Sequence, residues 1–243
     1  MYQKKNFLAI IPARAGSKRI PNKNLQLIGD KPMIQFTIEA AISSVGECNT
    51  IMSSNDMNAV NLAKKLGLRV PFIRPEELST DTATTSSVIT HTVQWHKKQY
   101  GFIPDNLILL QPTSPFRTGG DINKSIKQFI SSKKQTLVSA CEPIQNPGDF
   151  LFKNKDGKYT RLDTVKDKEN INRRQQYPET YFIDGGIYIS KTSQFIETGN
   201  MIGQDPELFL TSQSHAIDID TPFDLDLARS IYKYGMVRQL GHD

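Results

Sequence analysis

Short apolar runs alternate with longer amphipathic segments along most of this chain, and this alternation is what most constrains its fold. The pattern predicts strands at residues 6–12, 49–54, 68–73, 105–112, 135–143, 181–190 and 215–219, and helices at residues 31–44, 56–67, 84–99, 118–132 and 221–234. Strands that alternate with helices of this length form a parallel sheet in which each helix crosses over the sheet. The sequence therefore predicts an α/β fold with a mostly parallel sheet and helices on both faces.

The alternation stops near residue 147 and resumes near residue 182. The intervening residues 147–182 are polar and rich in turn formers, and Asp156-Gly157 is typical of a tight hairpin. Aromatic side chains still recur through the segment, at Phe150, Phe152, Tyr159, Tyr177 and Tyr181. We therefore interpret it as a structured insertion in one domain that spans residues 1–243.

The composition limits the classes of partner. The net charge of +5 over 243 residues is modest, and neither a basic helix nor a set of aromatic platforms suggests nucleic-acid binding. No apolar stretch approaches the roughly 20 residues of a membrane span, and the first residues lead directly into a strand without a signal peptide. Cys48 and Cys141 lack metal-ligand spacing and indicate free thiols in a reducing cytoplasm. We expect a cytoplasmic protein that binds a small anionic substrate.

A small, positively charged loop follows the first predicted strand. This loop, residues 12–24, carries Arg14, Gly16, Ser17, Lys18, Lys23 and Asn24. Ligands of open α/β sheets bind beyond the carboxyl ends of the strands, and a glycine lets the backbone approach a ligand closely. Backbone N–H groups with a serine hydroxyl can cradle phosphate oxygens, although the spacing is neither that of a P-loop nor GxGxxG. The loop predicts phosphate binding, with a solvated basic turn as the alternative.

Two carboxylates lie near the end of the chain, at Asp218 and Asp220. In a strand, residues two apart project from the same face. Paired carboxylates near phosphates suit Mg²⁺ (or Mn²⁺), a hard cation that prefers oxygen ligands. The alternative is that Asp220 and Thr221 cap the next helix.

Several motifs resemble those of the CMP-sialic acid synthetases, the acylneuraminate or nonulosonate cytidylyltransferases. In order from residue 9 to residue 228 they are "PARAGSKRIPNKN", "RPEELSTDTATT", "LLQPTSPFR", "RRQQYP" followed by "DGGIYI", and "AIDIDTPFDLDLA". The resemblance implies a Rossmann-like fold of the nucleotide-diphospho-sugar transferase type. It also implies a nucleotidyltransferase that converts CTP and an acidic nine-carbon sugar to a CMP-sugar and pyrophosphate.

The resemblance also implies roles for individual residues. Catalysis would involve Arg14, Lys23 and Asp218, although no side chain stands out as the general base, and a water on the metal is the other candidate. Nucleotide contacts would come from Ala13, Arg14, Gly16, Ser17, Lys18, Asn24, Arg74, Ala83 and Thr85. Sugar contacts would come from Gln111, Thr113, Ser114, Arg117 and Arg174. Asp218 and Asp220 would hold the metal.

The resemblance further implies a homodimer, in which the insertion at 147–182 forms the interface and reaches the partner's active site with Arg173 or Arg174. Three other functions stay open. The nearest is a 3-deoxy-octulosonate cytidylyltransferase with the same fold. A glycosyltransferase would carry its paired aspartates mid-chain, and a non-catalytic nucleotide-sugar-binding domain would not need the metal pair. Phe182-Ile183-Asp184 replaces an arginine that some sialic acid members carry, so the identity of the nonulosonic acid stays open.

Overall fold

The computed structural model describes residues 7–145, 149–161 and 179–235. The strands are β1 (Phe7–Ala13), β2 (Leu27–Ile28), β3 (Lys31–Pro32), β4 (Thr50–Ser54), β5 (Asn106–Leu109), β6 (Thr136–Cys141), β7 (Leu151–Lys153), β8 (Tyr159–Arg161), β9 (Phe182–Lys191) and β10 (Glu207–Leu210). The helices are α1 (Met33–Ser44), α2 (Met57–Lys65), α3 (Thr85–Tyr100), α4 (Gly119–Ser132), α5 (Thr192–Thr198) and α6 (Pro222–Lys233).

The central sheet has six strands in the order β10-β6-β9-β5-β1-β4. β1 pairs in parallel with β4 and β5, and β10 pairs in parallel with β6. β9 lies antiparallel between β5 and β6, so it is the one strand of this sheet that runs against the others. The prediction of a mostly parallel sheet is confirmed. Since the other five strands share one direction, the loops that follow them meet at one edge.

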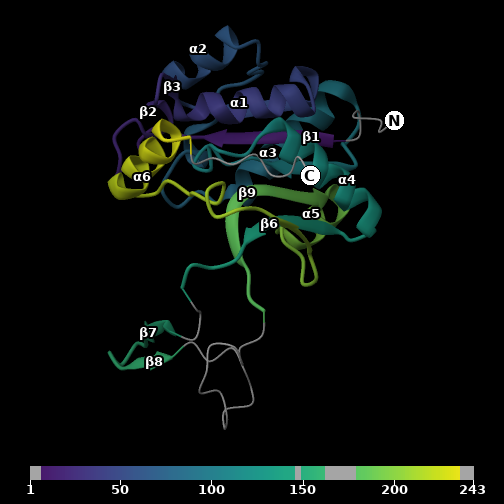
Figure 1. Cartoon of the computed structure of the whole chain (residues 1–243). Coiled ribbons are helices and arrows are strands. Elements are labelled where there is room, and N and C mark those ends of the chain that lie inside the picture. Colours follow the sequence, from purple (N-terminus) through teal and green to yellow (C-terminus); the bar gives the residue numbers. More distant parts are fainter. Residues whose placement is uncertain (1–6, 146–148, 162–178, 236–243) are drawn as a thin grey trace.

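Both faces of the sheet are covered by helices, as predicted (Figure 1). Successive side chains of β1 alternate between the two faces, as the period of a strand requires. Ala9 and Ile11 pack with α1, α2 and α4, whereas Leu8 and Ile10 pack with α3 and α5. A third cluster packs α6 against the basic loop and the chain that follows it, through Ile20, Ile28, Ile219, Leu225 and Ile231.

Two predicted strands are absent. Residues 68–73 form no ladder with the edge strand β4, and Pro71 has no N–H to donate to one. Residues 215–219 run without a strand partner, and the edge position beside β6 is taken by β10, which the sequence reading did not predict. Helix α5 was not predicted either, because its seven residues are too few for a clear apolar period.

The predicted hairpin is present within the insertion. β7 and β8 pair antiparallel around Asp156-Gly157, and Gly157 has a positive φ of 79°. The hairpin stands away from the central sheet (Figure 1). Residues 147–148 and 162–178 of the insertion, which include Arg173, Arg174 and Tyr177, lie outside the described residues.

Cys48 is exposed, Cys141 is buried, and both are free thiols. None of the helices described is long and apolar enough to cross a membrane.

Candidate active site

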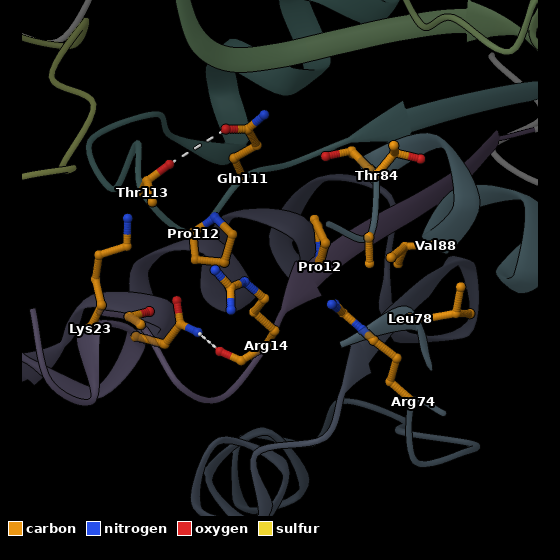
Figure 2. Close-up of a pocket in the computed structure, with 14 residues that line it drawn as sticks. Pro12, Arg14, Lys23, Arg74, Leu78, Thr84, Val88, Gln111, Pro112 and Thr113 are labelled. Atoms are coloured by element: carbon orange, nitrogen blue, oxygen red, sulfur yellow. Dashed lines mark hydrogen bonds between the residues drawn. The ribbon is translucent and has the colours of Figure 1, made fainter. Parts of the chain in front are cut away.

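A cavity of about 230 Å³ opens at the carboxyl end of β1. Three segments form its walls: the basic loop (residues 12–24), the chain from residue 74 to residue 88, and the turn after β5. The lining residues are Pro12, Arg14, Ser17, Lys23, Asn24, Arg74, Leu78, Ala83, Thr84, Thr85, Val88, Gln111, Pro112 and Thr113. In the view of Figure 2, Lys23, Arg14 and Arg74 lie along one side, and Thr113, Gln111 and Thr84 lie along the other. The sequence therefore brings its predicted phosphate and base contacts together.

The basic loop is held in shape by its own backbone groups. Gly16 has a φ of 76°, and a Cβ built on it would meet nothing within 4 Å, so the backbone conformation alone requires glycine here. The N–H of Ala15 donates to Asn55 Oδ1 at 2.8 Å, and Asn24 Nδ2 donates to the Arg14 carbonyl at 3.2 Å. These two bonds fix the start of the loop to β4's end and close it on itself.

Arg74 is a buried cation at the back of the cavity. Its Nε donates to Ser53 Oγ at 3.1 Å, and its Nη2 donates to the Ser53 carbonyl. Burial, with a smaller contribution from the nearby charge of Arg14, lowers the pKa of Arg74 to about 10. The group is still charged at neutral pH. Two guanidinium groups that repel each other around one cavity favour an anionic ligand.

Lys23 reaches across to the end of the chain. Its Nζ donates to the Ile219 carbonyl at 2.9 Å and to Asp220 Oδ1 at 2.9 Å, and its side chain is only 16% exposed. Asp220 is not a helix cap, because Thr221 caps α6 in a reciprocal pair with Asp224. The Asp220 carboxylate is therefore not used by the helix and is paired with Lys23 instead.

Asp218 lies on an extended segment and not on the short strand that was predicted. The N–H of Ile219 donates to the Thr113 carbonyl at 2.8 Å, which fastens this segment to the turn after β5. The Thr113 hydroxyl bonds the Asp218 carboxylate, and burial raises the pKa of that carboxyl group. Its Oδ1 is buried and has no hydrogen-bond partner among the described residues. Buried polar atoms are normally hydrogen-bonded, so this oxygen is a candidate ligand-binding atom.

The chain beside Asp218 leaves no room for a side chain. Gly185 has a φ of 75°, and a Cβ there would lie 3.0 Å from Ser114 Oγ and 3.6 Å from Asp218 Oδ2. The preceding carboxylate, Asp184, is buried and accepts hydrogen bonds from the hydroxyls of Ser139 and Thr211. Asp184 thus holds the part of β9 that packs against Asp218. The sequence reading noted this residue only as a departure from the family pattern.

The structure separates the predicted sugar contacts into two groups. Gln111 and Thr113 line the cavity, whereas Ser114 and Arg117 are buried beneath it. Arg117 donates to the carbonyls of Ser114 and Gln111 and to Thr37 Oγ1, each at 2.7 Å. Burial lowers its pKa to about 9. Arg117 thus holds the turn that carries Gln111 and Thr113. We do not include Arg117 among the sugar ligands of the proposed site.

Replacing Arg117 with lysine tests this position. We expect Arg117→Lys to lower the free energy of unfolding by about 2–4 kcal/mol, because a lysine keeps the charge but loses the planar set of buried hydrogen bonds. Urea unfolding followed by circular dichroism measures the change. If stability is unchanged and the KM for the acidic substrate rises instead, Arg117 contacts that substrate directly.

The remaining predicted contacts fall around the cavity. Ala13 is buried at the end of β1 and does not line it. Lys18 lines a neighbouring cavity of about 280 Å³ with Arg19 and Asp81. Asp81 was not predicted as a site residue, yet it forms ion pairs with Arg14 at 2.9 Å and Lys18 at 2.5 Å. Its position in the "RPEELSTDTATT" motif is the sequence feature that could have indicated Asp81 as a site residue.

The family profile described as "Cytidylyltransferase" matches residues 8–207, from β1 to the start of β10. The chain belongs to the cytidylyltransferase family. It is therefore an enzyme, a nucleotidyltransferase, as the motifs predicted. Membership of this family argues against the glycosyltransferase and the non-catalytic binding domain.

Two relatives in the family match nearly the whole chain. The CMP-N,N'-diacetyllegionaminic acid synthase of Legionella pneumophila is 35% identical over 237 residues, covering 92% of this chain and 95% of that protein. The pseudaminic acid cytidylyltransferase of Campylobacter jejuni is 30% identical over 229 residues, covering 93% and 96%. The N-acylneuraminate cytidylyltransferase of Escherichia coli is 30% identical, but this chain spans only 51% of it.

Solved structures support the fold of the cytidylyltransferase. A CMP:2-keto-3-deoxy-manno-octonic acid synthetase complexed with CTP superimposes with a TM-score of 0.64 at 16% identity, covering 94% of this chain and 99% of that one. The 4-diphosphocytidyl-2C-methyl-D-erythritol synthase of Anaerococcus prevotii superimposes with a TM-score of 0.61 at 12% identity, covering 95% and 100%. At these identities the likeness concerns the fold, which is the predicted nucleotide-diphospho-sugar transferase type.

Proposed function

We propose that this cytidylyltransferase couples CTP to a nonulosonic acid, an acidic nine-carbon sugar of the sialic type, and releases pyrophosphate. One observation carries the proposal: Arg14 and Lys23 of the basic loop and Arg74 of a second segment line one cavity, and two carboxylates contact its lining residues, Asp220 at Lys23 and Asp218 at Thr113. Cations together with carboxylates of the type that binds metals suit a nucleoside triphosphate. The names of the relatives indicate the class of acid.

The reaction would be an in-line displacement at the α-phosphorus. The oxygen of the anomeric hydroxyl forms the new bond to phosphorus while the bond to the β-phosphate oxygen breaks, and pyrophosphate leaves with that electron pair. The hydroxyl proton passes to the Asp218 carboxylate or to solvent. Arg14 and Lys23 stabilise the negative charge that grows on the phosphates, so that catalysis consists mainly of positioning and electrostatic stabilisation.

The carboxylates fit a divalent cation that arrives with the nucleotide. Asp218 has an unpartnered buried oxygen, and Asp220 uses one oxygen on Lys23. In the described part of the chain, no group of three or more histidine, cysteine, aspartate or glutamate side chains could hold a metal. Mg²⁺ prefers one or two carboxylates with phosphate and water oxygens, so Asp218 and Asp220 would hold it. When bound, it would neutralise phosphate charge.

The cavity also offers a place for the base of the nucleotide. Leu78 and Val88 give it an apolar wall, and Ala83, Thr84 and Thr85 contribute backbone groups and hydroxyls next to Arg74. A narrow pocket with a few fixed polar groups is what selects a pyrimidine. Gln111 and Thr113, across the cavity, are placed to contact the sugar.

A substrate panel tests the proposal. Pyrophosphate release should be measured with CTP and, in turn, N-acetylneuraminic, legionaminic, pseudaminic and 3-deoxy-octulosonic acids. We expect turnover with at least one nine-carbon acid and only background turnover with the octulosonic acid. Turnover with the octulosonic acid alone would favour the alternative branch, and turnover with none would reject the proposed substrate class.

We also propose that the enzyme is a homodimer whose interface is carried by the insertion at 147–182. The described hairpin exposes Phe150, Leu151, Phe152 and Tyr159, an apolar surface that suits a second copy of the chain. We expect light scattering to give twice the monomer mass at micromolar concentration. Replacing Phe150, Phe152 and Tyr159 with serine should shift the protein toward the monomer. An unchanged dimer would place the interface elsewhere.

A further inference from the structure

A second cavity continues from the first and is lined by four cations. These are Arg14, Lys18, Arg19 and Lys23, and two acids, Asp81 and Asp220, complete the charged lining. Both acids are engaged: Asp220 pairs with Lys23, and Asp81 pairs with Arg14 and Lys18. In the free protein, three of the four cations of this cavity are thus already paired with the chain's own carboxylates, two of them with Asp81.

Asp81 gives both of its oxygens to the basic loop. Oδ1 lies 2.9 Å from Arg14 Nη2, and Oδ2 lies 2.5 Å from Lys18 Nζ. The carboxylate does not cap a helix, since Thr84 caps α3. The hydrogen bond from Lys18 lowers the pKa of Asp81, and the positive charges of Lys18 and Arg14 lower it as well. The carboxylate is therefore ionised throughout the neutral range.

We propose that Asp81 competes with phosphate groups for Arg14 and Lys18, and that this competition weakens the binding of pyrophosphate. The inference rests on the proposed function, in which these cations bind the triphosphate. When phosphates enter, Arg14 and Lys18 must turn from the carboxylate, and the remaining negative charge of Asp81 repels the ligand. A site with four cations and no such competitor would hold its product tightly. Asp81 therefore favours release of pyrophosphate after the reaction.

Inorganic pyrophosphate is the direct probe, because it carries phosphate groups and no base or sugar. Its affinity should be measured by calorimetry, without metal, for wild type, Asp81→Asn and Asp81→Glu. We expect Asp81→Asn to bind pyrophosphate about three- to tenfold more tightly, because the ligand no longer has to displace two exposed ion pairs. Asp81→Glu, which keeps the charge, should stay near wild type. The gain should shrink as salt is raised, because exposed charges are screened.

Asp205→Asn is the matched control. Asp205 also forms an exposed ion pair, with Lys134, but that pair lies next to the amino end of β6, at the opposite edge of the sheet from the cavity. We expect no change in pyrophosphate affinity from this variant. A change equal to that of Asp81→Asn would show that net charge alone governs binding and would overturn the proposal.

Two other outcomes would also overturn it. Weaker binding by Asp81→Asn would mean that Asp81 positions Arg14 for phosphate, and unchanged binding would mean that the ion pairs do not compete. Failure of the proposed function looks different: wild type would bind no pyrophosphate and would release none from CTP with any acid of the panel. If the wild type binds pyrophosphate but Asp81→Asn binds it no more tightly, only the present inference is rejected.

Discussion

Asp218→Asn is expected to abolish Mg²⁺-dependent pyrophosphate release, with a loss in kcat of at least about 10³, because a cation that neutralises phosphate charge contributes several kcal/mol to the transition state. The Asp218 carboxylate carries the buried, unpartnered Oδ1 and lies beside Thr113. An amide of the same shape cannot supply the charge that the cation needs. Asp220→Asn should lose activity as well, since we propose Asp220 as the second ligand of the pair.

The same substitution should leave the protein as stable as wild type or make it more stable. Burial raises the pKa of the Asp218 carboxyl group in the folded state, so the folded protein binds its proton more readily than the unfolded chain does. Ionisation therefore costs stability as the pH rises through that raised pKa. Asparagine removes this cost at neutral pH. Thermal unfolding at pH 7 measures it, and a marked loss of stability would show that Asp218 serves the fold.

The raised pKa also has a consequence for activity. If the cation needs the ionised carboxylate, the acid limb of the kcat/KM profile at limiting Mg²⁺, which reports the free enzyme, should lie at a higher pH than an unperturbed aspartate would set. Asp226→Asn is the matched control, because Asp226 is an exposed carboxylate of α6 paired only locally with Arg229. It should keep wild-type kcat, Mg²⁺ dependence and pH profile. Near-wild-type activity of Asp218→Asn at limiting Mg²⁺ would contradict the metal assignment.

Lys23→Ala should lower kcat by about 10²–10³ while weakening CTP binding much less. Other cations, Arg14 and Arg74, still line the cavity and hold the nucleotide in the ground state. Lys23 lies at the far end of the basic loop, where in the proposed reaction charge would grow as pyrophosphate departs. Its ammonium group is also fixed in place, by the Ile219 carbonyl and Asp220, both at 2.9 Å, so it is preorganised for that charge.

CTP affinity by calorimetry and kcat by pyrophosphate release should be measured on the same Lys23→Ala protein. Lys18→Ala is the comparison, because the Lys18 side chain is 78% exposed and, among the described residues, forms its ion pair with Asp81. We expect a much smaller loss in kcat from it. A large loss of affinity with unchanged kcat would assign Lys23 to binding. Recovery of kcat at high Mg²⁺ would mean that Lys23 acts by placing Asp220.

The sequence by itself determined the layers of the fold and the place of the site. The alternation of apolar runs and amphipathic segments predicted β1, β4, β5 and β6 and the helices between them. A strand that is buried on both faces of a sheet appears in the sequence as a continuous apolar run. The position of the basic loop after β1 indicated the ligand edge, because that edge follows from strand direction alone. Its residues Arg14, Ser17, Lys23 and Asn24 do line the cavity.

Tertiary structure decided which groups meet. That Asp220 pairs with Lys23, nearly 200 positions earlier in the chain, and that Asp81 pairs with Arg14 and Lys18, depends on how loops from different strands converge. The "QPTSPFR" motif could not show that Gln111 faces the cavity while Arg117 is buried below it, since both are polar and six residues apart. Local sequence records burial and turns, whereas pairing between distant side chains is a property of the packed chain.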